Sequence, residues 1–192
     1  MEVTVVIAVI AALTHGIAFI LYNRTAQNPK AASWAVWAFS AALNALTYRV
    51  MSNDLVMTLQ FYTGSVACFL TFVYLLARGR FGWPSEGAWA SLVLACVALL
   101  VWHRLQNATW ANMILLVSVG ISFIPTFTGA LKQHEDEPML PWALWTAAFV
   151  MSSFNVWLRD GNVMSYVTPV ALMAMHGSIV CIKCYKFQRI EH

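Results

Sequence analysis

"SWAVWAFSAALNALT", residues 33–47, places two tryptophans three positions apart and follows them with an asparagine and a threonine. A related segment, "PWALWTAAFVMSSFN", occupies residues 141–155. At a constant offset of 108 residues, the segments pair Trp34 with Trp142, Trp37 with Trp145, Asn44 with Ser152, and Thr47 with Asn155. The pairing predicts an internal repeat.

The composition around these segments is that of a membrane protein. Hydrophobic residues make up 60% of the chain and charged residues 10%, and the mean hydropathy is +0.68, far above that of a soluble domain. A bilayer-spanning helix needs about 20 mostly apolar residues. Long runs without alternation argue against strands. Seven charge-poor runs of suitable length occur, at about 3–22, 34–51, 57–77, 88–106, 109–131, 139–157 and 163–184. We therefore predict an all-α integral membrane protein with seven transmembrane helices.

The polar loops divide these spans into two blocks. "NRTAQNPKAAS" (23–33) and "KQHEDEPML" (132–140) each contain a proline, and each leads into a Trp-x-x-Trp segment. We predict a three-helix repeat over residues 1–83, a linker helix over 84–108, a second repeat over 109–185, and a cytoplasmic tail over 186–192. A single linker helix restores the chain direction, so the two repeats are expected to be parallel.

The net charge of +3 is interpreted as membrane topology, not as a nucleic-acid-binding surface. Cytoplasmic loops are enriched in Lys and Arg. With the N-terminus outside, the inner side carries Arg24, Lys30, Arg78, Arg80, Lys132, Lys183, Lys186 and Arg189, and the outer side carries Arg49, Arg104 and Arg159. This bias predicts a cytoplasmic C-terminus in a plasma (inner) membrane. The expected partners are the lipid bilayer and a small-molecule solute, and a homo-oligomer is compatible with the sequence.

This 3+1+3 plan resembles that of the SWEET, PQ-loop and KDEL-receptor-like superfamily. Pro125, followed by threonine, stands where the family has a proline-glutamine pair, and His15 stands at the corresponding place in the first repeat. Pro169, followed by valine, stands where SWEET-type carriers have a proline-asparagine step. The resemblance implies two helix repeats around a central solute path. Riboside carriers of the Pnu type share the plan, so the class of solute stays open.

Helical periodicity assigns polar residues of the repeated segments to common faces. Positions i, i+7 and i+10 or i+11 share one face of a helix, and polar side chains in membrane helices face the bundle interior. Two stripes result: Trp37, Asn44, Thr47 and Tyr48 in the first repeat, and Trp145, Ser152 and Asn155 in the second. We predict that they bind a small neutral polar solute in a central cavity. The alternative is that they only bond neighbouring helices, and that Trp34 and Trp142 are interfacial anchors.

Two histidines and two prolines are candidates for gating or coupling. His15 and His176 fall in the inner half of spans that run in the same direction, and imidazoles can relay protons near neutral pH. Pro125 and Pro169 interrupt helical hydrogen bonding and could act as hinges. All eight acidic residues fall in loops or termini, which favours a facilitator over a proton-coupled carrier.

The sequence gives little support to other functional classes. Neither a nucleophile–base pair nor paired carboxylates are present, so we expect no enzyme activity and no catalytic residues. Cys181 and Cys184 lack further ligands at metal-binding spacing, so neither a metal nor a cofactor is expected. Lys183 lies at the end of the last span, where it could not carry retinal as in a rhodopsin. The open alternatives are a receptor-like membrane protein that binds without transport, and a His-dependent proton-coupled carrier.

Overall fold

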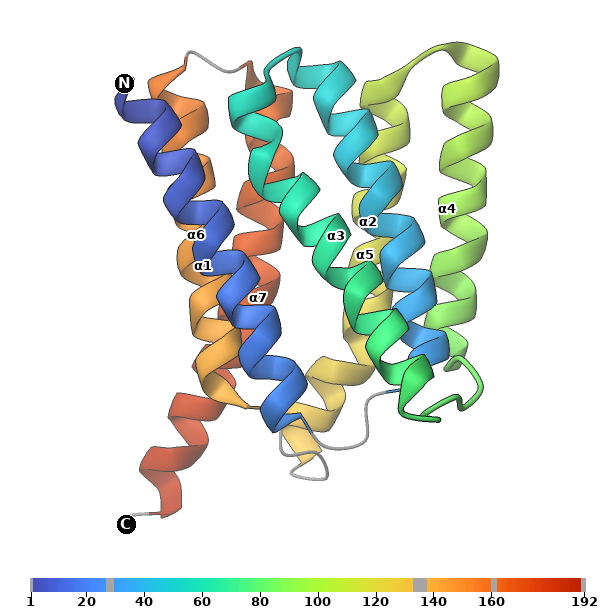
Figure 1. Ribbon diagram of the computed structural model, residues 1–192, viewed down its shortest axis with the longest axis vertical. Coiled ribbons are helices and arrows are strands. Elements are labelled where there is room, and N and C mark those ends of the chain that lie inside the picture. Colours follow the sequence, from blue (N-terminus) through green and yellow to red (C-terminus); the bar gives the residue numbers. More distant parts are fainter. Residues whose placement is uncertain (1, 27–29, 133–137, 160–161, 191–192) are drawn as a thin grey trace.

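The computed structural model describes residues 2–26, 30–132, 138–159 and 162–190. Within this part, seven α-helices follow one another along the chain: α1 (Val3–Thr25), α2 (Ala31–Ser52), α3 (Leu55–Ala77), α4 (Glu86–Leu105), α5 (Ala108–Lys132), α6 (Met139–Leu158) and α7 (Val163–Ile190). They run alternately up and down, so the two termini lie at opposite ends of the bundle (Figure 1). The prediction of seven helices is confirmed. Pro29, most of the loop at 132–140 and the last two tail residues lie outside the described part.

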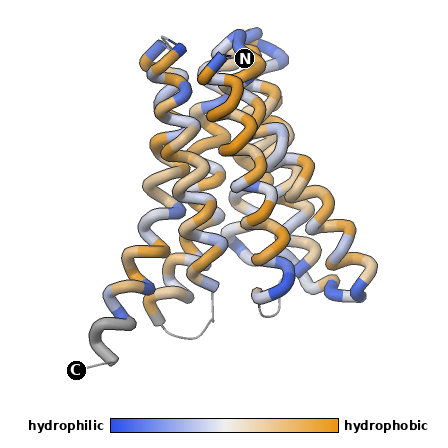
Figure 2. The backbone as a smooth tube through the Cα atoms, turned by 60° about the vertical axis from the view of Figure 1, so that its left-hand side comes forward, coloured by the Kyte–Doolittle hydropathy of each residue, from blue (hydrophilic) through white to orange (hydrophobic). Residues whose placement is uncertain are grey.

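Six of these helices are long and apolar enough to cross a membrane. The exception is α2, whose 22 residues include the first Trp-x-x-Trp segment and the buried Ser40, Asn44 and Thr47. Hydrophobic residues cover most of the helical length and hydrophilic ones concentrate near the two ends (Figure 2). The chain is therefore a helical integral membrane protein, as its composition predicted.

The hairpin between α2 and α3 shows how local sequence sets helix ends. Asn53 adopts a left-handed conformation (φ 50°), which ends α2. The next residue, Asp54, caps α3, because its Oδ1 accepts hydrogen bonds from the backbone N–H of Val56 (2.7 Å) and Met57 (3.1 Å). Two residues are therefore enough to reverse the chain.

Helix neighbours do not follow chain order. α3 lies between α1 and α2, whose backbones do not pack directly against each other in the described part of the chain, and α7 lies in the same way between α5 and α6. α1 also packs against α6, and α2 against α5. α4 covers α5 and α2 from outside, at the edge of the bundle (Figure 1). The other six helices surround the interior, and the candidate site lies among them and the start of α4.

Candidate functional site

A cavity of about 530 Å³ occupies the half of the bundle where α2, α4 and α6 begin. It reaches the surface there, because its lining includes the exposed Lys30 and Ser85; we call this the open end. Along α2 the lining continues to Asn44, about 20 Å from Lys30 at 1.5 Å per residue. Its size lies within the range of small-molecule pockets, about 300–1,000 Å³.

Aromatic rings form much of the cavity wall. Six side chains make a closed series of ring contacts, with successive centroids 5.0–6.2 Å apart and planes tilted by 40–74°. We call them the aromatic cluster: Phe19, Trp34, Trp37, Phe123, Trp142 and Trp145. All except Phe123 line the cavity. Both Trp-x-x-Trp segments therefore contribute to the cavity wall, together with Phe19 of α1.

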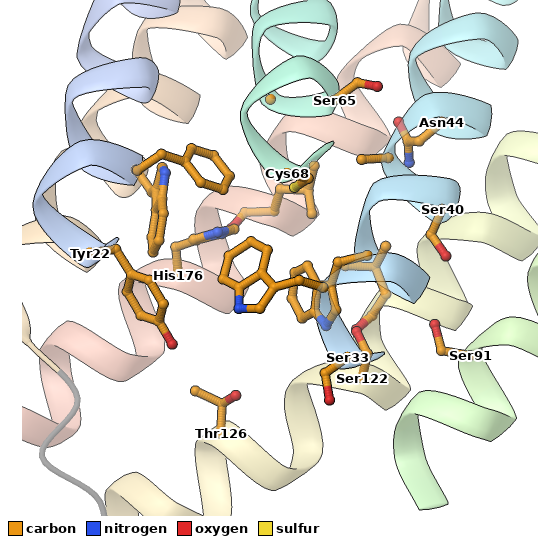
Figure 3. A pocket seen from close by; sticks show the side chains of 18 of the residues that line it. Tyr22, Ser33, Ser40, Asn44, Ser65, Cys68, Ser91, Ser122, Thr126 and His176 are labelled. Atoms are coloured by element: carbon orange, nitrogen blue, oxygen red, sulfur yellow. The ribbon is translucent and has the colours of Figure 1, made fainter. Parts of the chain in front are cut away.

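Four buried polar side chains line the cavity and have an atom without a hydrogen-bond partner among the described residues. These atoms are Ser40 Oγ, Asn44 Oδ1, Gln60 Oε1 and Trp145 Nε1. Each of the four residues is at most 5% exposed. An unpaired buried polar atom costs about 1–3 kcal/mol, so this arrangement is suited to a solute that supplies the missing partners. Ser40 and Asn44 approach the cavity from the side opposite Tyr22 and His176 (Figure 3).

The two predicted histidines line the same cavity and contact the same two rings. His15 lies 6.4 Å from the Trp145 ring and 5.3 Å from the Phe149 ring, and His176 lies 5.7 and 5.1 Å from them. His15 Nδ1 accepts a hydrogen bond from Gln60 Nε2 (3.1 Å). His176 Nδ1 donates to the backbone oxygen of Leu172 (2.7 Å). Each ring is therefore fixed in orientation through its Nδ1 atom.

Polar contacts join the helices at the other end of the bundle, which we call the closed end. Tyr48 on α2 donates its hydroxyl hydrogen to the backbone oxygen of Ser165 on α7 (2.8 Å). Asn112 on α5 donates to Thr47 Oγ1 on α2 (3.0 Å) and accepts from Thr168 Oγ1 on α7 (2.5 Å). These bonds lie beyond Asn44, where the cavity lining on α2 stops.

An ion pair lies at the same end, outside the membrane-spanning segments. Arg159 Nε donates to Asp54 Oδ2 at 2.6 Å, and its Nη1 contacts Thr4 Oγ1 (2.9 Å) and Glu2 Oε2 (3.4 Å). Burial acts to raise the pKa of Asp54, but the hydrogen bond from Arg159 and the backbone N–H groups that cap α3 outweigh it, so its pKa lies below the ordinary range. The carboxylate correspondingly raises the pKa of Arg159.

The predicted site residues divide according to depth in the bundle. Those that line the cavity are Trp37, Asn44, Trp145, His15, His176 and Pro125. Those outside its lining are Thr47, Tyr48, Ser152, Asn155 and Pro169, all buried within the protein. Helical spacing correctly placed the polar residues of each stripe on an interior face, but the cavity stops before their second half, which lies toward the closed end.

Gln60 is a cavity residue that the sequence analysis missed. It is 2% exposed and interacts directly with His15. The signal was present, since an amide in an apolar span is as unusual at position 60 as at position 44. No group of three or more His, Cys, Asp or Glu among the described residues is placed to hold a metal ion.

No protein-family model, curated protein or solved structure matches this chain. Its function is therefore inferred from the geometry and chemistry of the cavity.

Proposed function

We propose that this protein is a membrane facilitator that binds a small neutral polar solute in the cavity and passes it between the two sides of the membrane. The observation that carries the proposal is a cavity that runs from the surface to the middle of the bundle and is lined there by buried residues whose polar atoms lack partners. The closed end, with its hydrogen bonds and ion pair, is the gate that would have to part for release on the other side.

We further propose that α1–α3 and α5–α7 are two parallel repeats, joined by α4 as a linker. The helix contacts support this, because exchanging α1 with α5, α2 with α6 and α3 with α7 maps each contact among these helices onto another. The α1–α6 contact becomes α5–α2, and the α1–α3 and α2–α3 contacts become α5–α7 and α6–α7. The gate contacts of Tyr48, Asn112 and Arg159 all join one proposed repeat to the other.

The lining favours a neutral solute and passive transport. Lys30, at the surface, is the only charged side chain among the described residues that line the cavity. A charged solute would therefore lose its water without meeting an opposite charge deeper in the bundle. Lys30, Arg78 and Arg80 lie near the open end, so the positive-inside rule favours a cavity that opens to the cytoplasm.

Uptake by proteoliposomes tests the proposal. The full chain is reconstituted, and the entry of labelled glucose, glycerol, uracil and hypoxanthine is compared with that into protein-free liposomes. A facilitator gives saturable uptake of at least one solute, up to equal concentrations inside and outside. Saturable binding without uptake would favour a receptor-like protein, and the absence of both would refute a role in handling these solutes.

Alanine variants connect uptake to the cavity. Asn44→Ala and Trp145→Ala should each cost about 1–3 kcal/mol of binding, or one to two decades of affinity. Trp37→Ala should also weaken binding, because it removes part of the aromatic wall. Asn155→Ala is the control, because Asn155 is buried but lies outside the lining, so it should lower only the melting temperature. Unchanged affinity in the three cavity variants would mean that the repeated segments serve only packing.

A further inference from the structure

The unpaired atoms of the cavity have a definite hydrogen-bonding character. Asn44 Oδ1 and Gln60 Oε1 can only accept hydrogen bonds, and Trp145 Nε1 can only donate. Gln60 already uses its nitrogen on His15, so its oxygen is the end that remains for a solute. Ser40 Oγ can do either. A complementary solute therefore carries two donors and at least one acceptor.

The aromatic cluster adds a requirement for shape. Its cavity-lining rings come from α1, α2 and α6, and the backbones of α2 and α6 do not pack against each other in the described part of the chain. The cavity therefore presents indole surface from separate directions. A flat ring with π-faces can pack against such surfaces in offset-stacked or edge-to-face geometry, with its polar groups kept at its edge.

A sugar is less complementary to this cavity wall. A sugar carries a hydroxyl on nearly every ring carbon, and each hydroxyl needs partners once it is buried. Two hydroxyls in the lining are already engaged: Ser91 Oγ bonds Ser118 Oγ at 2.8 Å, and Ser122 Oγ donates to the backbone oxygen of Val119 at 2.7 Å. Part of a sugar's edge would remain unpaired against aromatic rings.

We propose that the solute is a neutral, planar heteroaromatic molecule of one or two rings, with N–H donors and a carbonyl or ring-nitrogen acceptor on its edge. The inference rests on the proposed function only in that this cavity is taken as the solute site, and binding alone would support it. Asn44 and Gln60 accept from the N–H groups of the solute, Trp145 donates to its acceptor, and the indoles pack against its faces.

Calorimetric titration of the purified full chain tests the class with matched probes. Uracil has two N–H donors and two carbonyl acceptors on an aromatic ring, and hypoxanthine is its two-ring counterpart. 1,3-Dimethyluracil has no donor and should bind at least about 10-fold more weakly. 5,6-Dihydrouracil keeps the donors and acceptors but loses aromaticity, and should bind about 3- to 10-fold more weakly. Glucose should show no saturable binding.

One variant isolates the donor on the wall. Trp145→Phe keeps an aromatic ring and removes the Nε1–H, so uracil affinity should fall about 3- to 10-fold. Trp157→Phe is the matched control, because Trp157 lies on the same helix, is 60% exposed and is outside the lining. Equal effects of the two variants would refute the role of Trp145. The probe series on the unmodified chain stands even if Trp145→Phe does not fold.

The outcomes separate this inference from the proposed function. If uracil or hypoxanthine is both bound and taken up, the solute class and the facilitator function are both supported. If either is bound but not taken up, the solute class is supported and the facilitator function is refuted. Uptake of glucose or glycerol with neither heterocycle bound supports the facilitator and overturns the solute class. Equal affinity for uracil and its dimethylated analogue also overturns it.

Discussion

Gly64 on α3 gives a sensitive test of how His15 is held. A Cβ added at this position would lie 3.0 Å from His15 Nε2 and 3.6 and 3.7 Å from two other atoms of the ring. The ring has little freedom to move, because Gln60 holds its Nδ1 and Phe149 packs edge-on against it at 5.3 Å. Gly64→Ala should therefore displace the imidazole by a few tenths of an ångström and weaken its bond to Gln60.

The size of the effect follows from two opposing contributions. Alanine in a helix is more stable than glycine by about 0.5–1 kcal/mol. Losing the His15–Gln60 bond and leaving buried polar groups unpaired costs about 1–3 kcal/mol. We expect Gly64→Ala to lower the free energy of unfolding by about 1–2 kcal/mol. Gly16→Ala is the control, because its Cβ would meet only Thr63 Cγ2, at an ordinary 3.8 Å, and should keep the helix-propensity gain.

Thermal unfolding of the purified variants in one detergent, followed by circular dichroism, measures the difference. Gly64→Ala should melt below the unmodified chain, and Gly16→Ala at or above it. In a His15→Ala background there is no ring to displace, so Gly64→Ala should no longer be destabilising. A Gly64→Ala variant as stable as Gly16→Ala, or a cost that persists without the imidazole, would refute the reasoning.

Three further predictions address the gate, the coupling and the topology. Because the pKa of Asp54 is depressed, its bond to Arg159 should stabilise the closed end fully above the ordinary carboxyl pKa near 3.8 and be lost as the pH falls through the depressed value. Asp54→Asn should therefore melt below the unmodified chain at neutral pH, and the difference between the two melting temperatures should shrink as the pH falls. A difference that stays constant would contradict this. If the protein is a facilitator, uptake should not depend on an imposed proton gradient, and His15→Ala and His176→Ala should lower it only modestly. Accumulation that is driven by the gradient and abolished by either change would indicate proton coupling. Labelling of single cysteines in intact cells should find Asn107 external and the α3–α4 loop cytoplasmic, and the reverse pattern would refute the predicted orientation.

Hydropathy and helical periodicity were sufficient to predict the helices and the interior faces, because both depend on local sequence. Trp37 and Asn44 could be placed toward the bundle centre in this way. The depth at which the cavity ends could not be predicted, since it depends on contacts between distant helices. Tyr48 shares a helix face with Asn44 but bonds Ser165, 117 residues away in the chain. The partnership of Gln60 with His15 likewise joins residues on helices whose packing no local pattern specifies.

The polar residues that line the cavity on α2 also bear on how the chain enters the membrane during synthesis. Each hydrophobic segment emerging from the ribosome partitions into lipid according to its own hydropathy, and α2 falls short of the other six helices in this respect. Only two residues separate it from the more apolar α3, against which it packs. We expect α2 to be inserted together with α3 as a helical hairpin, which shields its amide and hydroxyl groups from lipid. Asn44→Leu should then improve insertion of an isolated α2 while removing an unpaired oxygen from the cavity. The amide that lines the proposed solute site therefore makes this helix harder to insert.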